Sequence, residues 1–341
     1  MDIVLRERGR ECRSAHWLPL RRSIPGSEVA RLRANGMKFL ASAFRNTLPF
    51  FIYKYLYIIW PEQKRQREEE ERTRPEREQA LAEHHRILAL TCRNADLKDR
   101  HRGARIFVLC NGPSVRNQNI RPLKDELVIS VSSGYLHPDY AEIAPAYHCV
   151  PQVTYGLMTR KDVVAWFREM HERLGKATLI LSETEEPLVR AEGLFPGRDV
   201  RYVDLEARFA DLPPGAIPDL TTAIPRIQSV PILALMLAMY LGGDRLYLLG
   251  TDHDHFRSGE YKYFYEPTVL RGKDISVDER GKLRGGWFAE LSALVTLWSQ
   301  YRSIKEIAAQ NDIEIFNATQ GGELDEFPRV ELDSLLSNSK E

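Results

Sequence analysis

The stretch IFVLCNGPSVRN, residues 106–117, joins a run of apolar residues directly to an Asn-Gly-Pro-Ser turn. The apolar run predicts a short buried strand, and Gly112 marks a point where the backbone passes close to another group. Pro113 presets φ for a turn or a first helical position, and Ser114 can cap the short helix that follows. The N–H groups of such a helix start suit a phosphate, although an ordinary strand-to-helix turn has the same pattern.

Similar apolar runs recur along the chain and alternate with helical patterns. The six predicted strands are Arg105–Asn111, Glu126–Ser133, Ala146–Val150, Ala177–Ser182, Asp244–Gly250 and Ile313–Thr319. The predicted helices between them are Arg160–Leu174, Ile227–Leu241 and Phe288–Asn311. Most of the strand runs are continuously apolar, which indicates strands buried on both faces. This order predicts an α/β fold, a single Rossmann-like, doubly wound, mostly parallel sheet with a helical N-terminal extension.

The composition is typical of a globular protein with no strong overall charge. The 341 residues include 48 basic and 48 acidic side chains, so the formal net charge is zero. Without a global positive field, we expect no nucleic acid partner. The cysteines contain no Cys-x-x-Cys pair, which argues against a disulfide framework or a zinc knuckle and favours a cytoplasmic location.

The N-terminal residues differ in composition from the rest of the chain. Residues 1–36 are rich in arginine and lack periodicity, so we expect a weakly ordered segment, and Met37 offers an alternative start. Residues 37–60 are apolar and aromatic, but their longest uncharged piece is too short to cross a bilayer. They fit either an interfacial anchor at the inner face of the membrane or a helix packed against the catalytic domain.

A charged segment connects these residues to the apolar strands. Residues 61–104 mix both charge signs densely, which predicts a solvated helical linker that is broken or restarted near Pro75. The Rossmann-like catalytic domain is predicted at residues 105–335, because all six apolar runs lie there.

Four ionisable residues follow the strand in DRLYLLGTDHDHF, residues 244–256. They are Asp252, His253, Asp254 and His255. Such groups are costly to bury without a partner, so they predict a metal site, a general base or hydrogen bonds to a ligand, with a polar loop as the alternative. Asp252 and Asp254 alone would bind a divalent metal weakly, so a metal stays open and no metal site is assigned.

The helix that precedes this strand is strongly apolar. It lies in PRIQSVPILALMLAMYLGG, residues 225–243, and its helical part carries no charge, which predicts burial beneath the sheet. Ser229 before Pro231 is a good N-cap arrangement. Its helix start could therefore face the same crevice as Ser114, and two helix starts beside an acidic, histidine-bearing loop are typical of a nucleotide-phosphate site.

The segments VLCNGPSV and SVPILALMLAMYLGGDRLYLLGTDHDHF resemble a pattern shared by two related families. One is the bacterial sialyltransferases that use CMP-activated sugars. The other is named for 6-hydroxymethylpterin diphosphokinase and includes the flagellin-modifying motility accessory factors. The closing IEIFNATQGGELDEFPRVELDSLL, residues 313–336, resembles members of the second family found in surface-polysaccharide pathways.

The resemblance implies a set of nucleotide-site residues in this chain. They are Asn111, Gly112, Pro113 and Ser114, with Ser229 near the phosphate and Asp252 approaching the same crevice. Two features depart from the family patterns. Residues 271–290 contain no histidine, although the sialyltransferases place a catalytic histidine before their last long helix. The acidic metal-binding and His-Gly-Asp-type segments of the pterin kinases are also missing from the sequence.

These features together predict a glycosyltransferase of bacterial surface-glycan biosynthesis. Its donor would be a nucleotide-activated sugar, with a CMP-sugar favoured, and its acceptor a glycan or a protein. The predicted catalytic residues are His253, His255 and Asp252, with one of the two histidines as the base. Arg271, Lys273 or a tyrosine of residues 260–267 would neutralise the departing phosphate. The alternatives are a diphosphokinase that needs ATP and a metal, and a non-catalytic nucleotide-binding or scaffold protein.

Overall fold

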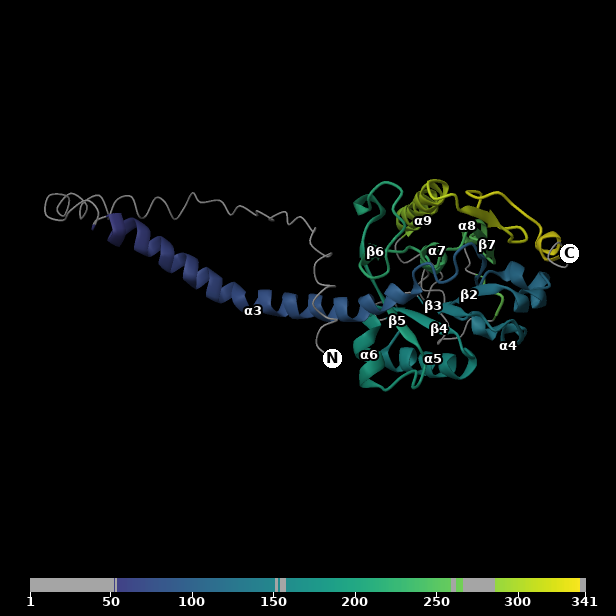
Figure 1. Ribbon diagram of the computed structural model, residues 1–341, viewed down its shortest axis with the longest axis horizontal. Helices are drawn as coiled ribbons and strands as arrows, with labels where there is room; N and C mark the ends of the chain where they lie inside the picture. Colours follow the sequence, from purple (N-terminus) through teal and green to yellow (C-terminus); the bar gives the residue numbers. More distant parts are fainter. Residues whose placement is uncertain are drawn as a thin grey trace. The chain divides into compact units, whose positions relative to one another are not determined.

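The structure is a computed structural model, shown in Figure 1, and it describes residues 52, 54–150, 153, 158–258, 262–265 and 286–337. Contacts divide the chain into two compact units, with the boundary between Gln79 and Ala80. The predictions for residues 1–36, for most of residues 37–60 and for Arg271 and Lys273 lie outside the described residues.

The described part of the smaller unit is helical. A π-helical turn, Tyr55–Ile59, leads into α3, Trp60–Thr91, which continues into the larger unit. The helix runs through Pro75, so the predicted break there is wrong. A proline removes one backbone hydrogen bond from a helix interior, and the glutamate- and arginine-rich turns on either side favour helix strongly enough to maintain it.

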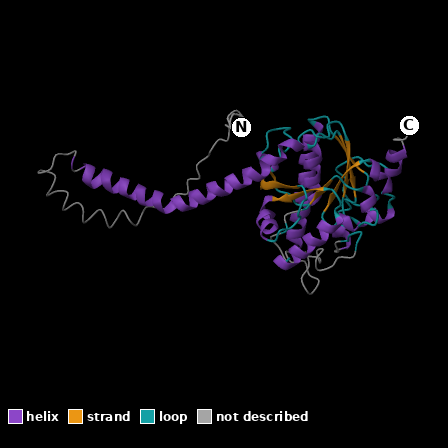
Figure 2. Cartoon of the chain, turned by 60° about the horizontal axis from the view of Figure 1, so that its bottom comes forward, coloured by secondary structure: helices purple, strands orange, loops and turns teal. Residues whose placement is uncertain are grey.

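The larger unit is built on a sheet of eight parallel strands in the order β6-β5-β4-β3-β2-β1-β7-β8. The strands are β1 (Arg105–Leu109), β2 (Leu127–Val131), β3 (Tyr147–Cys149), β4 (Thr178–Ser182), β5 (Val200–Ala207), β6 (Ala223–Pro225), β7 (Arg245–Leu249) and β8 (Glu314–Asn317). Figure 2 shows helices on both faces of this sheet. The predicted doubly wound α/β sheet is confirmed, and it is entirely parallel.

The two strands at one edge of the sheet, β5 and β6, were not predicted from the sequence. Charged residues at Arg201, Asp204 and Glu206 interrupt β5, so this strand lacks the continuous apolar run of the central strands. β6 is only three residues long and gives too short a pattern to detect. Both strands lie where the sheet is less buried, and an edge strand needs fewer apolar residues than a central one.

The helices of the larger unit pack on the two faces of the sheet. They are α4 (Tyr140–Ile143), α5 (Arg160–Arg173), α6 (Glu186–Ala191), α7 (Val230–Tyr240), α8 (His255–Ser258), α9 (Gly286–Ala309) and α10 (Leu332–Ser337). β1 shows how the core divides: Ile106 and Val108 pack with α7, which is buried from Pro231 to Tyr240, whereas Phe107 and Leu109 belong to a separate cluster. Successive side chains of a strand point to opposite faces, so both faces of the sheet are covered.

The strand order places a topological switch point between β1 and β7. The chain builds the sheet outward from β1 to β6 and then returns to place β7 on the other side of β1. In open α/β sheets, ligands bind outside the carboxyl ends of the strands at such a switch point. The residues that follow β1 and β7 therefore form the candidate site.

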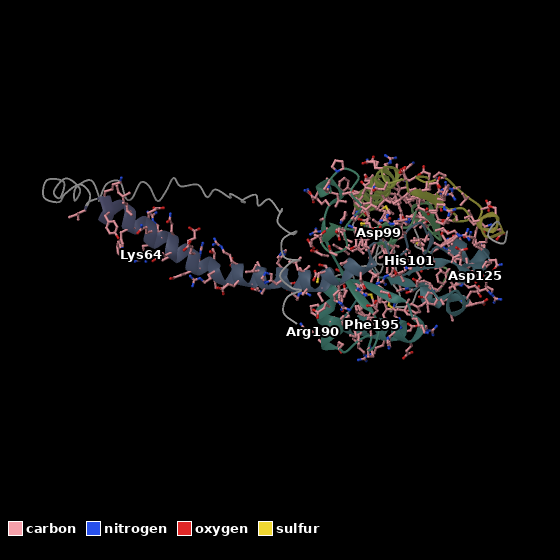
Figure 3. The ribbon with its side chains drawn as sticks, viewed as in Figure 1. Lys64, Asp99, His101, Asp125, Arg190 and Phe195 are labelled. Carbon is pink, nitrogen blue, oxygen red and sulfur yellow. The ribbon has the colours of Figure 1, made fainter. Side chains whose placement is uncertain are left out.

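Helix α7 begins at the same edge of the sheet. Its C-terminal carbonyls at Tyr240 and Leu241 accept hydrogen bonds from the main-chain N–H groups of Asp99 and His101, at 3.0 and 2.7 Å. Figure 3 labels Asp99 and His101. Asp99 and His101 lie just before β1, at the amino edge of the sheet. An 11-residue helix that ends at the amino edge and runs antiparallel to the strands starts at the carboxyl edge.

Candidate functional site

The turn after β1 passes very close to the loop after β7. The main-chain N–H groups of Cys110 and Gly112 donate to the carbonyls of Leu249 and Gly250, at 2.8 and 2.9 Å. A Cβ on Gly112 would lie 1.8 Å from Asp252 Oδ2. Since φ at Gly112 is −62°, the glycine is required by this close approach and not by its backbone conformation.

Ser114 and Asp252 join the two segments directly. The main-chain N–H of Ser114 donates to Asp252 Oδ1 at 3.1 Å, and its hydroxyl donates to Asp252 Oδ2 at 2.8 Å. Both residues are buried. Burial raises the pKa of Asp252, and the hydrogen bonds from Ser114 oppose this shift without cancelling it. In this structure the carboxylate therefore occupies the anion position that the sequence analysis assigned to a phosphate.

Asn111 places an unsatisfied acceptor beside this contact. The residue is 9% exposed, and no described residue donates a hydrogen bond to its buried Oδ1. A Cβ built on Gly134, which follows β2, would lie 3.5 Å from that oxygen. A buried acceptor without a partner costs about 1–3 kcal/mol. The ends of β1 and β2 thus hold a buried acceptor that has no donor among the described residues.

The described part of the tyrosine-rich segment lies against the same turn. The main-chain N–H of Phe264 donates to the carbonyl of Asn111 at 3.1 Å, and Arg116 donates to the carbonyl of Phe264. The Phe264 ring packs edge-on against His137, with centroids 5.4 Å apart. Tyr263 and Tyr265, on either side of Phe264, stack with centroids 5.2 Å apart. These contacts fix residues 262–265 over the Asn111 backbone.

Ser229 occupies the N-cap position of α7, but its side chain makes no capping hydrogen bond. Instead Gln300 of α9 organises the helix entrance. Its Oε1 accepts from the main-chain N–H of Gln228 at 2.8 Å, and its Nε2 donates to the carbonyl of Arg226 at 2.8 Å. Ser229 is therefore at the carboxyl edge of the sheet, where the sequence analysis expected it, without the predicted capping contact.

The two histidines after β7 have different surroundings. His253 is half-buried with φ of 47°, and its Nε2 lies 2.8 Å from the hydroxyl of the fully buried Tyr301. Burial, with a smaller contribution from nearby His255, lowers the pKa of His253 to about 4. His255 begins α8, and its Nε2 lies 2.7 Å from Glu290 Oε1.

Glu290 was not singled out by the sequence analysis. A signal was nevertheless present, because Glu290 is the only charged residue between Gly286 and Tyr301. A lone charge in an apolar helix requires a partner if it is buried. The partner, His255, is 35 residues away in sequence, so the pairing was not visible as a motif.

Arg329 supports the site from the loop after β8. Its guanidinium donates to four main-chain carbonyls, those of Thr319, Gly321, Gly322 and Leu324. This loop in turn backs the β7 loop: the main-chain N–H of Glu323 donates to the Asp252 carbonyl at 2.7 Å, and a Cβ on Gly322 would lie 2.7 Å from Asp252 Cα. Arg329 was also not predicted as a site residue, because no local sequence pattern indicates that main-chain carbonyls surround it.

The potential metal ligands and the cysteines of the described part of the chain are characterised by their geometry and burial. No group of three or more histidine, cysteine, aspartate or glutamate side chains is arranged there to hold a metal ion. Cys110 and Cys149 are buried thiols whose pKa is raised by burial, and Cys92 is exposed. Cys12 lies outside the described residues.

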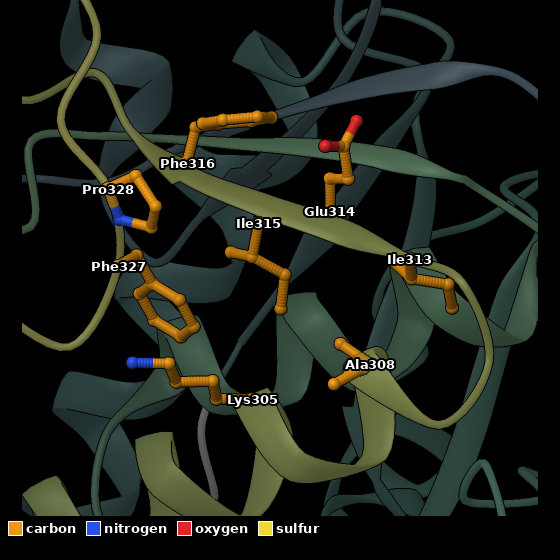
Figure 4. A pocket seen from close by; sticks show the side chains of 9 residues that line it. Lys305, Ala308, Ile313, Glu314, Ile315, Phe316, Phe327 and Pro328 are labelled. Atoms are coloured by element: carbon orange, nitrogen blue, oxygen red, sulfur yellow. The ribbon is translucent and has the colours of Figure 1, made fainter.

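A groove of about 200 Å³ lies elsewhere, between β8 and the C-terminal half of α9 (Figure 4). Its lining is mainly apolar and includes Ile315, Phe316 and Phe327. None of the predicted site residues lines it. The groove therefore does not bear on the switch-point site.

The site at the β1 and β7 ends thus combines a close-approach glycine, a buried serine–carboxylate contact, an unsatisfied amide oxygen and an imidazole–carboxylate pair. Comparison with known proteins finds no matching family model, no matching curated protein and no matching solved structure.

Proposed function

We propose that this protein is a glycosyltransferase that uses a nucleotide-activated sugar, with a CMP-sugar favoured, in bacterial surface-glycan biosynthesis. The observation that carries the proposal is the contact between Ser114 and Asp252 across the switch point, next to the unsatisfied Asn111 oxygen. The proposed acceptor is a glycan or a protein. The resemblance to CMP-sugar-dependent sialyltransferases and to the 6-hydroxymethylpterin diphosphokinase-like family supports the same proposal.

The donor phosphate would dock at the turn formed by Asn111, Gly112, Pro113 and Ser114, with Ser229 at the α7 start. Asp252 holds the Ser114 donors in the present structure, so a phosphate has to compete with its carboxylate. The raised pKa of Asp252, caused by burial, lowers the cost of its neutral form. A neutral Asp252 can donate its proton to a phosphate oxygen instead of repelling it.

The proposed reaction forms one bond and breaks one. A base after β7, His253 or His255, takes the proton of the acceptor hydroxyl, and the acceptor oxygen forms the new glycosidic bond. The bond between the sugar carbon and the phosphate oxygen breaks, and the nucleoside monophosphate leaves with the electron pair of that bond. Donors around the turn stabilise the leaving phosphate, as preorganised N–H and O–H groups do at other anionic transition states.

Thermal unfolding with separate nucleotides tests the proposal. CMP at 100 times its dissociation constant should stabilise the protein by about 2.7 kcal/mol, which corresponds to a rise in Tm of about 5 °C. The variant Ser114→Ala should lose most of this rise, whereas Ser299→Ala, which alters an exposed hydroxyl bonded to its own helix, should keep it. Stabilisation only by ATP with magnesium would favour the diphosphokinase, and no response to CMP, UDP, GDP or ATP would overturn the proposal.

Peripheral contact with the inner face of the membrane is part of the same proposal, together with a cytoplasmic location. Among the described residues, no helix has the length and apolar character needed to span a bilayer. Exposed apolar side chains occur on both units, at Ile52, Tyr55, Ile58 and Trp60 and at Trp287, Phe288, Leu291 and Val295. Aromatic and aliphatic side chains of this kind favour the membrane interface.

Sedimentation with vesicles tests this contact. The full chain should pellet with vesicles of phosphatidylglycerol and phosphatidylethanolamine, and a variant with Tyr55→Ser, Ile58→Ser and Trp60→Ser should pellet less. The matched control, Leu81→Ser and Leu88→Ser, changes exposed leucines of α3. Equal pelleting of all three proteins would contradict an anchor in the smaller unit.

A further inference from the structure

The two histidines after β7 are not equivalent candidates for the base. His253 is held on several sides: its Nε2 bonds Tyr301, and its ring packs against Trp298 and Tyr301 with centroids 6.0 and 5.6 Å apart. Tyr301 is fully buried, so the hydrogen bond directs the His253 ring into the protein core. A residue held in this way is suited to fixing the loop rather than to exchanging protons with an acceptor.

His255 has the arrangement of a positioned imidazole. The Nε2 atom lies 2.7 Å from Glu290 Oε1, and the two side chains are only 11% and 13% exposed. A carboxylate can only accept a hydrogen bond from a neutral imidazole, so this geometry places the His255 proton on Nε2. The proton-accepting nitrogen of the ring is then Nδ1. In a hydrogen-bonded carboxylate–imidazole pair, the carboxylate orients the ring and stabilises the imidazolium that forms.

The surroundings of Glu290 support a specific role for this carboxylate. It lies in the second turn of the 24-residue helix α9, Gly286–Ala309. No other residue between Gly286 and Tyr301 is charged, and the exposed surface of these turns carries Trp287, Phe288 and Leu291. A carboxylate that only served solubility would face the solvent, whereas Glu290 is turned towards His255.

We propose that His255 takes the proton of the acceptor hydroxyl and that Glu290 is the positioning residue that holds its ring. This assignment rests on the proposed glycosyl transfer. In the reaction, the acceptor oxygen loses its proton to His255 Nδ1 as the bond to the sugar forms. The positive charge of the imidazolium is balanced by Glu290, and the proton is released to water after the product leaves.

Kinetics of four variants test this assignment, with CMP-N-acetylneuraminate as the first donor probe. His255→Ala and Glu290→Gln should each lower kcat about 100-fold with little change in the KM for the donor, because the proposed roles place both residues at the acceptor hydroxyl and not at the nucleotide. Glu290→Gln introduced into His255→Ala should cost less than about threefold more, because without the imidazole no imidazolium forms whose positive charge Glu290 would balance. Glu306→Gln, an exposed glutamate of the same helix, should keep wild-type turnover.

The outcomes separate this assignment from the proposed function. A loss of kcat in Glu290→Gln that persists unchanged in the His255→Ala background would overturn the positioning role. Wild-type turnover in His255→Ala would remove His255 as the base while leaving the glycosyltransferase intact. If the wild-type protein turned over no nucleotide-sugar at all, the proposed function itself would fail.

Nitrogen-15 NMR tests the pair without any substrate. Wild-type His255 should be the Nε2–H tautomer, and Glu290→Leu should shift it towards a mixture of tautomers. Glu290→Gln should retain the Nε2–H form, because the amide oxygen can still accept the hydrogen bond. An Nδ1–H tautomer of His255 in the wild-type protein would contradict the geometry on which the assignment depends.

Discussion

Two buried polar clusters of this protein differ in whether the fold satisfies them. Between β2 and β3, His148 is fully buried, its Nδ1 lies 2.7 Å from the Ser130 hydroxyl, and its Nε2 lies 2.8 Å from the Ser132 carbonyl. The Tyr140 hydroxyl completes the cluster at 3.0 Å from Ser130. Because the Ser132 carbonyl can only accept, His148 carries its proton on Nε2 and every ring nitrogen has a partner.

The cluster at the ends of β1 and β7 is not satisfied in the same way. The Asn111 oxygen has no hydrogen-bond donor among the described residues, and Asp252 is buried with a raised pKa. A closed polar network adds stability and rigidity, whereas an open one costs stability. The β2–β3 cluster therefore supports the fold, and the β1–β7 cluster is the one at which the proposed ligand would supply the missing partners.

The largest effect that this comparison predicts is on stability at His148. Replacement of His148 by alanine removes both of its hydrogen bonds. It leaves the Ser132 carbonyl without this donor and creates a cavity in the core, so the free energy of unfolding should fall by about 3 kcal/mol. Urea denaturation measures this change. Nucleotide binding by the folded fraction should be unchanged, and a loss of less than about 1 kcal/mol would show that the cluster is not structural.

The second prediction concerns the pH dependence of stability. Burial lowers the pKa of His148 to about 3, below the unfolded value near 6.5, so the unfolded state binds the extra proton first. Stability should therefore fall as the pH falls below 6.5, by about 2 kcal/mol between pH 6.5 and 5 for this group. His148→Gln should remove this part of the slope in urea titrations. An identical slope in the variant would contradict a neutral, buried His148.

A smaller loss of stability is expected when Gly112 is replaced by alanine. A methyl group there would meet Asp252 Oδ2 at 1.8 Å and the Gly250 carbonyl at 2.5 Å, so Gly112→Ala must move one of the two loops. The free energy of unfolding should fall by about 2 kcal/mol, and the CMP-induced rise in Tm should disappear. Gly134→Ala is the matched control for stability, because its nearest contact would be an ordinary 3.5 Å. Full CMP stabilisation of Gly112→Ala would separate this turn from the nucleotide.

The smallest predicted change in stability is an increase, caused by replacing Asn111 with leucine. Asn111→Leu replaces an unsatisfied buried amide by an apolar side chain of similar size, so the protein should become more stable by about 1 kcal/mol. The same variant should lose CMP binding, which calorimetry can measure. A destabilised Asn111→Leu protein would mean that the amide is already satisfied and would remove the contrast between the two clusters.

The central strands and the turn after β1 were predictable from sequence because their signals are local. Six mainly apolar runs marked six of the eight strands, while the charged β5 and the very short β6 did not reach that pattern. The close approach at Gly112 was predicted and the resemblance brought Asp252 to the same crevice, but the direct contact between Asp252 and Ser114 was not predicted. Glu290 and Arg329 gave no motif, because their roles depend on partners brought together by the fold.

By itself, the sequence determined most of the segments that become strands and helices and the polar residues that follow the central strands, because apolar periodicity and turn chemistry act between near neighbours. Only the tertiary structure decided that Ser114 donates to Asp252, 138 positions away, and that His255 faces Glu290 rather than solvent. The physical reason is that such contacts depend on the order of the strands in the sheet and on the packing of α9. Both are set by the burial of the whole core and not by any single segment.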